Sequence, residues 1–180
     1  MPRLLEVKLY GSKVLANKAH EVEQITPEIK SLIEDMIFTM YHTEGVGIAA
    51  PQVGVPVRIF VCDPEYTKSE NKNPIILINP EFIEFEGEYE VEEGCLSVPG
   101  IYEKITRFKY VTIKYRDENW KECVLQAEDT FAVILQHEFD HLQGISFVDK
   151  ITPIRKMAIA FRLNRIIKKA HSMADDIIYL

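Results

Sequence analysis

Two histidines and one glutamate in the C-terminal half have the types and the spacing of a metal-dependent hydrolytic site. They lie in the segment His137-Glu138-Phe139-Asp140-His141, which matches the pattern HExxH. Residues four apart on an α-helix lie one turn apart on the same face, so both imidazoles can reach one ion, while Glu138 can contact a water on that ion. The alternative is that these residues only occupy a solvated helix face.

A catalytic site of this kind needs a third protein ligand and one open position. Thermolysin-like proteases take a glutamate downstream of the second histidine, and no glutamate follows His141. Metzincins use a histidine six residues after it, where this chain has Phe147. The third ligands used by both of these protease classes are therefore excluded, and the cysteines are the best remaining candidates for the third ligand.

Among the three cysteines, Cys95 has the most suitable neighbourhood. Glycine and proline lie on both sides of it in the segment 92–100, EEGCLSVPG, which suits a turn, and Gly94 allows another group to approach closely. Cys62 and Cys123 lie in apolar or alternating segments, where a small buried side chain is the expected role. A bound cation would deprotonate Cys95 and make it a ligand. A nucleophilic Cys-His pair is the structural rival.

A third segment, 44–54, is rich in small residues and reads EGVGIAAPQVG. It lacks the later glycine and the preceding strand of a dinucleotide-binding fingerprint, and no Lys-Ser/Thr follows as in a phosphate loop. The small residues allow another backbone to come close, and Gln52 offers an uncharged donor and acceptor.

Three helices are expected to position these residues. The first begins after Thr26 with Pro27 at its first position and has an apolar stripe that stops near Gly45. The second is capped by Asp129 or Thr130, carries the HExxH segment and ends at Gly144. The third begins at 152–153 and runs to about His171.

Between the first two helices, residues 57–125 contain short apolar runs rich in β-branched and aromatic residues. They are VRIFVC, IILI, YVTIKY and ECVLQA. These runs predict strands, mostly antiparallel because the connections are short. Helix, strands and then helices indicate an α+β fold with mostly antiparallel sheets packed around a central HExxH helix.

The motifs GVGIAAPQ, EGCLS and QHEFDH, in this order and at these separations, resemble the three signature motifs of the peptide deformylase family. The resemblance extends over roughly Leu4 to Asp149. It implies an enzyme that hydrolyses the formyl group from the N-terminal N-formylmethionine of new polypeptides and releases formate. Ser146 stands where the family usually has an apolar residue, and the terminal helix and tail match no family pattern.

The resemblance also implies roles at the motif positions. Cys95, His137 and His141 would bind one divalent metal. Iron(II) is the expected ion in the cell, and zinc, nickel or cobalt are expected alternatives in purified protein. Glu138 would be the general base that later protonates the departing amine, and Gln52 and the backbone N–H of Leu96 would donate to the oxyanion.

Several further residues are expected around the substrate. Val133 and Ile134 lie one helical turn before His137 and form either part of a methionine pocket or part of the core. The resemblance adds the backbone of Val46 and Gly47 as partners of an extended peptide, and Val91 and Tyr102 as pocket residues. Glu93 and Arg107 are expected to form an ion pair that supports the Cys95 turn.

Composition restricts the class of protein. The chain has 180 residues, 47% hydrophobic and 27% charged, which predicts one globular domain spanning residues 1–180. No apolar run approaches the ~18 residues of a membrane span, so no membrane association is expected. The three cysteines and the absence of a signal-like N-terminus predict a bacterial-type cytoplasmic protein.

Charge is distributed unevenly along the chain. The net charge is −7, but residues 153–180, the expected basic helix and tail, contain six Lys or Arg against two Asp. The rest is too acidic for a general DNA-binding protein. The basic residues (Arg155, Lys156, Arg162, Arg165, Lys168 and Lys169) either form a solvated face or make transient contact with the ribosome.

These observations favour a metal-dependent deformylase that acts on N-formylmethionyl nascent peptides. An endopeptidase is a rival within the same chemistry. A metal-stabilised module that binds nascent chains or ribosomes without catalysis is the alternative from another class.

Overall fold

The structure is a computed structural model that describes residues 1–66, 71–174 and 177–180. Its helices are α1 (Pro27–His42), α2 (Asp129–Leu142) and α3 (Pro153–Ser172), with short 3₁₀ helices η1 (Lys13–Ala16), η2 (Ala50–Val53) and η3 (Phe147–Asp149). Its strands are β1 (Gly47–Ala49), β2 (Ile59–Cys62), β3 (Ile75–Cys95), β4 (Val98–Arg116) and β5 (Glu122–Glu128). None of the helices in these ranges is long and apolar enough to cross a membrane.

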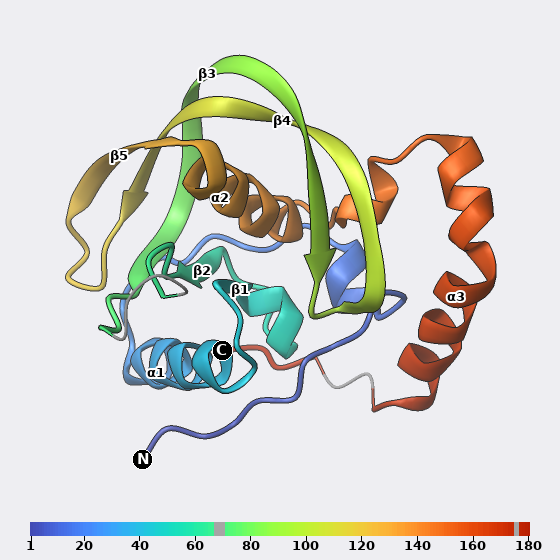
Figure 1. Cartoon of the computed structure of the whole chain (residues 1–180). Coiled ribbons are helices and arrows are strands. Elements are labelled where there is room, and N and C mark those ends of the chain that lie inside the picture. The colour runs from blue at the N-terminus through green and yellow to red at the C-terminus, as the bar shows by residue number, and fades with distance from the viewer. Residues whose placement is uncertain (67–70, 175–176) are drawn as a thin grey trace.

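The strands form one five-stranded antiparallel sheet in the order β1-β2-β3-β4-β5. β3 and β4 make a long hairpin that arches over α2, so that the HExxH helix lies centrally beneath it (Figure 1). Register shifts interrupt β3 and β4 at three places, and such bulges increase strand twist and bending. The expected α+β fold with a central HExxH helix is confirmed.

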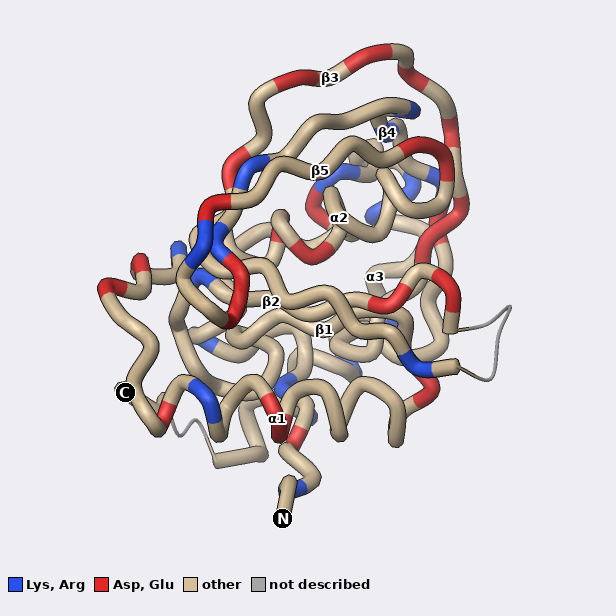
Figure 2. Tube along the Cα trace, turned by 90° about the vertical axis from the view of Figure 1, so that its left-hand side faces the viewer, with Lys and Arg blue, Asp and Glu red and all other residues tan. Residues whose placement is uncertain are grey.

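Three of the four apolar runs lie wholly on strands, and VRIFVC enters β2 at Ile59, but β3 and β4 are longer than predicted. Residues 79–95 and 98–109 also belong to this hairpin. Much of this part of β3 is exposed, and acidic residues are frequent along it (Figure 2). Residues 85–92, FEGEYEVE, alternate apolar residues or glycine with glutamates, a pattern that is typical of a strand and could have indicated this part of β3. Pairing with β4 holds it in the sheet.

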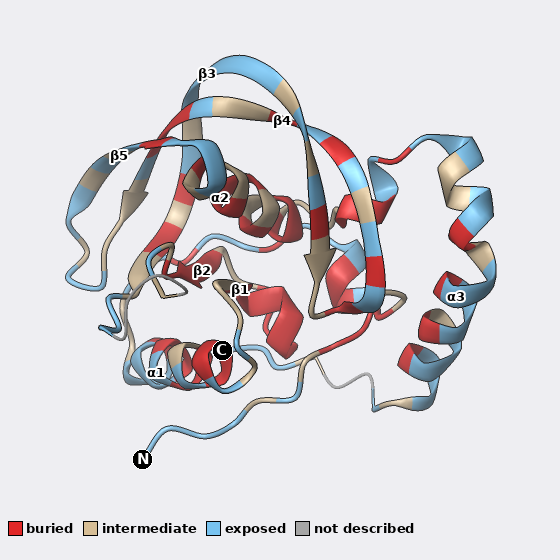
Figure 3. Cartoon of the chain, in the orientation of Figure 1, coloured by how far each residue is buried: buried red, intermediate tan, exposed pale blue. Residues whose placement is uncertain are grey.

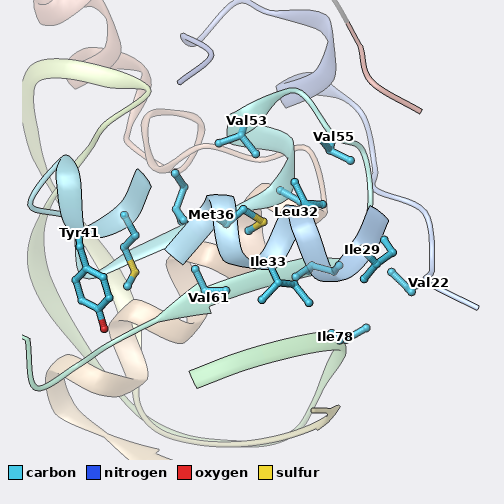
Figure 4. Packing of buried hydrophobic residues seen from close by; sticks show 14 residues of the cluster. Val22, Ile29, Leu32, Ile33, Met36, Tyr41, Val53, Val55, Val61 and Ile78 are labelled. Atoms are coloured by element: carbon cyan, nitrogen blue, oxygen red, sulfur yellow. The ribbon is translucent and has the colours of Figure 1, made fainter. Parts of the chain in front are cut away.

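The first helix forms as predicted. Thr26 Oγ1 accepts a hydrogen bond from Ile29 N at 3.2 Å, and Pro27 is the first helical residue. The apolar stripe of α1 packs against β1 and β2, and its residues Leu32, Ile33 and Met36 share one cluster with Val61 of β2, with Ile33 beside Val61 (Figure 4). The helix ends at His42, slightly before the predicted boundary near Gly45.

The start of α2 differs from the prediction of an Asp129 or Thr130 cap. The capping residue is Glu128, which makes no side-chain capping bond, and Asp129 is the first helical residue. β5 runs directly into α2 at this point, so the strand geometry leaves no separate capping turn. At the other end, Gly144 has φ +74°, and a Cβ there would lie 2.9 Å from the backbone of Ala16.

The third helix begins at the predicted position, with Thr152 Oγ1 accepting from Arg155 N at 3.4 Å. One face, which contains Ile159, Leu163 and Ile166, packs into a cluster with Phe147. The opposite face is exposed (Figure 3).

Candidate metal centre and active site

The HExxH helix and the tip of the β3–β4 hairpin bring three ligand atoms together. His137 and His141 lie on consecutive turns of α2, with ring centroids 5.1 Å apart. Cys95 is the last residue of β3, and its Sγ lies 3.4 Å from His141 Nε2. One ligand atom from each residue lies within 4.8 Å of the others, and no other such group of His, Cys, Asp or Glu occurs among the described residues. Cys62, buried in β2, and Cys123, on β5, are not part of it.

The hairpin turn fixes the direction of the Cys95 side chain. Cys95 pairs with Val98 across the sheet, so Leu96 and Ser97 form a tight connection. A Cβ at Gly94 would lie 2.5 Å from the ring of Tyr102. The close approach expected at Gly94 is therefore made by an aromatic ring of the neighbouring strand.

The surroundings of Cys95 stabilise the thiolate form of its side chain. Burial by itself would raise the pKa of the Cys95 thiol, but the nearby imidazoles of His141 and His137 outweigh it and hold this pKa well below its ordinary value. The thiolate is the form of cysteine that binds metals.

A buried carboxylate supports His137 from the other side. Glu93 Oε2 lies 2.7 Å from His137 Nδ1, which leaves Nε2 of the same ring available to a ligand. Arg107 donates to both oxygens of Glu93, at 2.7 and 3.1 Å, so these two residues make the ion pair proposed from the sequence. Burial would raise the pKa of Glu93, but the hydrogen bonds from His137 and Arg107 outweigh it and lower this pKa to about 2.

Glu138 occupies a confined place next to β1. Its side chain is buried, and its Oε2 has no hydrogen-bond partner among the residues that the structure describes. Burial raises the pKa of Glu138 to about 7. A Cβ at Gly47 would lie only 2.6 Å from Glu138 Oε1, so this carboxylate can hold its present position beside β1 only because residue 47 is glycine.

The amide of Gln52 is held in a single orientation in η2. Its Oε1 accepts from Ala49 N at 2.9 Å, and its Nε2 lies 3.2 Å from Ser97 Oγ and 3.5 Å from Cys95 Sγ. Because the oxygen is engaged by the backbone, the amide group presents its N–H donors to the thiol. Ser97 lies within EGCLS but was not predicted to have a role, because its contact with Gln52 spans 45 residues.

Several of these side chains line a cavity of about 560 Å³, although His141 and Arg107 are not among its lining residues. The residues proposed from the sequence that line it are Val46, Gly47, Gln52, Glu93, Cys95, Leu96, Tyr102, Val133, Ile134, His137 and Glu138. Val91 is not among the lining residues and packs instead against the cluster around Phe147. Tyr102 is 65% exposed, and Ile134 is buried.

The residues present fit a divalent metal. One thiolate and two imidazoles are a ligand set suited to zinc or a neighbouring transition metal, and three ligands from the protein leave one position open. The buried, unpartnered oxygen of Glu138 borders the same cavity, where a water or substrate could satisfy it.

Comparisons with known proteins agree with this geometry. A family model described as polypeptide deformylase matches residues 4–157. The chain belongs to the peptide deformylase family. A peptide deformylase of Fusobacterium nucleatum is 46% identical over 176 residues, which cover 95% of this chain and 97% of that protein. The family match ends inside α3, the helix for which the sequence showed no family pattern.

Solved deformylase structures share the whole fold. The crystal structure of a peptide deformylase from Legionella pneumophila has a TM-score of 0.85 at 37% identity and covers 94% of this chain and 98% of that one. The Thermus thermophilus deformylase has a TM-score of 0.85 at 38% identity, with coverage of 93% and 99%. As a member of this family, the chain is a metal-dependent hydrolase that removes the N-formyl group from nascent polypeptides.

Proposed function

We propose that Cys95, His137 and His141 hold one divalent metal, and that Glu138, Gln52 and the N–H of Leu96 carry out deformylation around it. The observation that carries this proposal is the convergence of the three ligand atoms within 4.8 Å. Two of the three residues, Cys95 and His137, line the cavity that Glu138 and Gln52 also line. No comparison supports the non-catalytic alternative, whereas the family assignment supports the enzyme.

A divalent cation supplies Lewis-acid chemistry in such a site, because it makes a water more acidic and polarises a carbonyl oxygen. Glu138 accepts a proton from the attacking water and delivers it to the departing amine nitrogen. Its buried carboxylate, with a pKa of about 7, suits both directions of this transfer.

The amide of Gln52 and the N–H of Leu96 donate hydrogen bonds to the formyl oxygen as negative charge develops there. A donor of this kind contributes ~3 kcal/mol to transition-state stabilisation. The orientation of Gln52 is fixed by Ala49 and Ser97, so little reorganisation is needed when the charge appears.

The substrate side of the cavity suits an unbranched apolar side chain. Val133 and Ile134 lie one helical turn before His137 on α2, and Tyr102 of β4 lines the same cavity. We propose that they contact the methionine side chain while the backbone of Val46 and Gly47 binds the peptide as an extended strand. Val91 is left out of this pocket because it lies in the cluster around Phe147.

The test compares wild-type protein with Glu138→Ala in an assay that measures formate release from formyl-Met-Ala-Ser. The variant should keep its metal and lose turnover by at least ~100-fold. Equal turnover would refute the mechanism. Cleavage of internal peptide bonds in a blocked peptide would favour an endopeptidase instead.

For the ion, we propose iron(II) in the cell, with zinc, nickel or cobalt able to replace it in purified protein. Thiolate and imidazole ligands accept all four ions, so the ligand set does not select one. Anaerobic purification followed by metal analysis tests this proposal, and protein that is isolated in this way with zinc, nickel or cobalt but without iron would contradict it.

We also propose that the chain acts as one domain in the cytoplasm and contacts the ribosome through α3. Ile154, Met157 and Phe161 form an exposed stripe on this helix, 81%, 78% and 77% exposed, respectively. Arg162 and Arg165 make no ion pair with any residue that the structure describes.

Co-sedimentation with ribosomes at low salt tests the contact, because phosphate-dominated binding weakens as salt rises. Neutralising the six basic residues of α3 should reduce retention. Unchanged retention would refute the contact without affecting the deformylase activity.

A further inference from the structure

A connected series of ion pairs leads from His137 to Lys150. Glu93 Oε2 lies 2.7 Å from His137 Nδ1, and Arg107 Nε donates to Glu93 Oε1 at 2.7 Å. Arg107 Nη1 then donates to Asp140 Oδ2 at 2.6 Å, and Lys150 Nζ lies 3.0 Å from the same oxygen. The carboxylate of Asp140 therefore connects the arginine behind the site to a lysine that is partly exposed.

Asp140 is placed to hold this arginine rather than to face the substrate. It is 8% exposed, it does not line the cavity, and it lies outside the group that could hold a metal. Arg107 is 3% exposed, and its planar guanidinium makes three hydrogen bonds to two carboxylates. A planar donor held on two sides cannot rotate without breaking one of them.

Asp140 can affect His137 because the ion pairs between them join three different elements of the fold. Glu93 comes from β3, Arg107 from β4, and Asp140 from the same helix as His137. The arginine thus ties the hairpin to α2 at a residue that lies three positions after His137 and directly before His141, the two histidines proposed as ligands. If Asp140 lost its charge, Arg107 could move with Glu93, and the His137 ring would lose its fixed partner.

We propose that Asp140 is a positioning residue for His137, acting through Arg107 and Glu93, and that Lys150 holds Asp140 in place. This inference rests on the metal site proposed above. It predicts that a change at Asp140, which touches neither substrate nor metal, weakens metal binding.

The test uses full-length protein loaded with cobalt and measures cobalt affinity by competition with a chelator. Asp140→Asn keeps the size of the side chain and removes its charge. Asp35→Asn is the matched control, because Asp35 is also a buried helical aspartate that pairs with an arginine, Arg3, at 3.0 Å. Both variants should lower the unfolding temperature.

Only Asp140→Asn should weaken cobalt binding, by about 10-fold, the lower end of the range for outer contacts of metal ligands. Its kcat should fall while its KM stays within about twofold of wild type, because the peptide contacts are unchanged. Wild-type cobalt affinity in Asp140→Asn would overturn the inference and leave Asp140 with a purely structural role.

A second pair of variants decides the matter if Asp140→Asn does not fold. Lys150 and Lys156 each pair with an aspartate at 3.0 Å and are 37% and 42% exposed. Lys150→Met should weaken cobalt binding about two- to threefold, and Lys156→Met should not change it. Equal affinities in these two variants would overturn the inference.

The same titration separates this inference from the proposed metal site. If wild-type protein binds no cobalt, or if Cys95→Ser binds it as tightly as wild type, the proposed metal site is wrong and the inference falls with it. If wild-type protein binds cobalt through Cys95 and Asp140→Asn is unaffected, only the inference is wrong.

Discussion

Replacing Gly47 with alanine should separate the catalytic role of Glu138 from the metal site. The added Cβ would lie 2.6 Å from Glu138 Oε1 and 2.9 Å from Cδ and Cγ of the same side chain. Gly47 is fixed by pairing with Cys62 in β2 and lies in the sheet, whereas Glu138 can change its side-chain torsions. The carboxylate should therefore move, and the strand should not.

The size of the effect follows from these distances. Ordinary contact begins near 3.4 Å, so Oε1 must move by at least about 0.8 Å. A displacement of ~1 Å of a catalytic group can cost ~100-fold in rate. We expect kcat to fall about 30- to 100-fold, and overpacking to lower the free energy of unfolding by about 1 kcal/mol. For a chain of this length that corresponds to ~2–4 °C in unfolding temperature.

Formate release from formyl-Met-Ala-Ser, metal content and thermal unfolding should be measured together. Gly45→Ala is the control, because a Cβ there would lie 3.4 Å from its nearest neighbour, Leu96 Cδ1, and should change kcat less than about threefold. The metal content of Gly47→Ala should match wild type. If this variant kept kcat within threefold of wild type, the confinement of Glu138 would not matter for catalysis and the reasoning would be refuted.

Three other substitutions follow from the structure. Ser97→Ala removes the hydroxyl that lies 3.2 Å from Gln52 Nε2. Because one hydrogen bond contributes ~1 kcal/mol, kcat should fall about fivefold in steady-state kinetics. An unchanged kcat would contradict the role of Ser97. Arg107→Met leaves two buried carboxylates without their shared partner and should lower the free energy of unfolding by ~3–5 kcal/mol in denaturant titrations. Gly144→Ala combines φ +74° with a Cβ contact of 2.9 Å to Ala16, so we expect a loss of ~2 kcal/mol by the same titration, and wild-type stability would contradict that geometry.

Local signals in the sequence predicted the helices well because caps and apolar spacing act over a few residues. Thr26 and Thr152 cap helices as expected. The length of the β3–β4 hairpin was missed because the prediction relied on continuous apolar runs. Residues 85–92 instead alternate apolar residues or glycine with glutamates, and residues 98–109 bury separate side chains such as Ile101 and Ile105. The cap of α2 was misplaced because a strand passes directly into the helix there, and Glu128 makes no side-chain capping bond.

The proposed metal ligands could be chosen from the sequence because two lie at a fixed helical spacing and the third lies in a glycine-rich turn. The contacts of Ser97 and Asp140 could not be inferred in the same way. Ser97 meets Gln52 from 45 positions away, and Asp140 meets Arg107 from 33 positions away. Which face of the hairpin meets α2 is decided by strand register, and bulges shift that register at three places.

The long β3–β4 hairpin explains why Cys95, a proposed metal ligand, and Glu93, which contacts His137, both reach α2. Cys95 and Glu93 lie two residues apart near the end of β3, so the strand directs both toward α2, where one approaches His141 and the other His137. A register shift lies between them, so their alignment depends on a local irregularity as well as on the regular strand. Arg107 on β4 then holds Glu93 and reaches back to Asp140 on α2. Since α2 supplies both histidines and the hairpin supplies the thiol and the carboxylate, neither element alone contains the site, and the ion pairs between them keep it assembled.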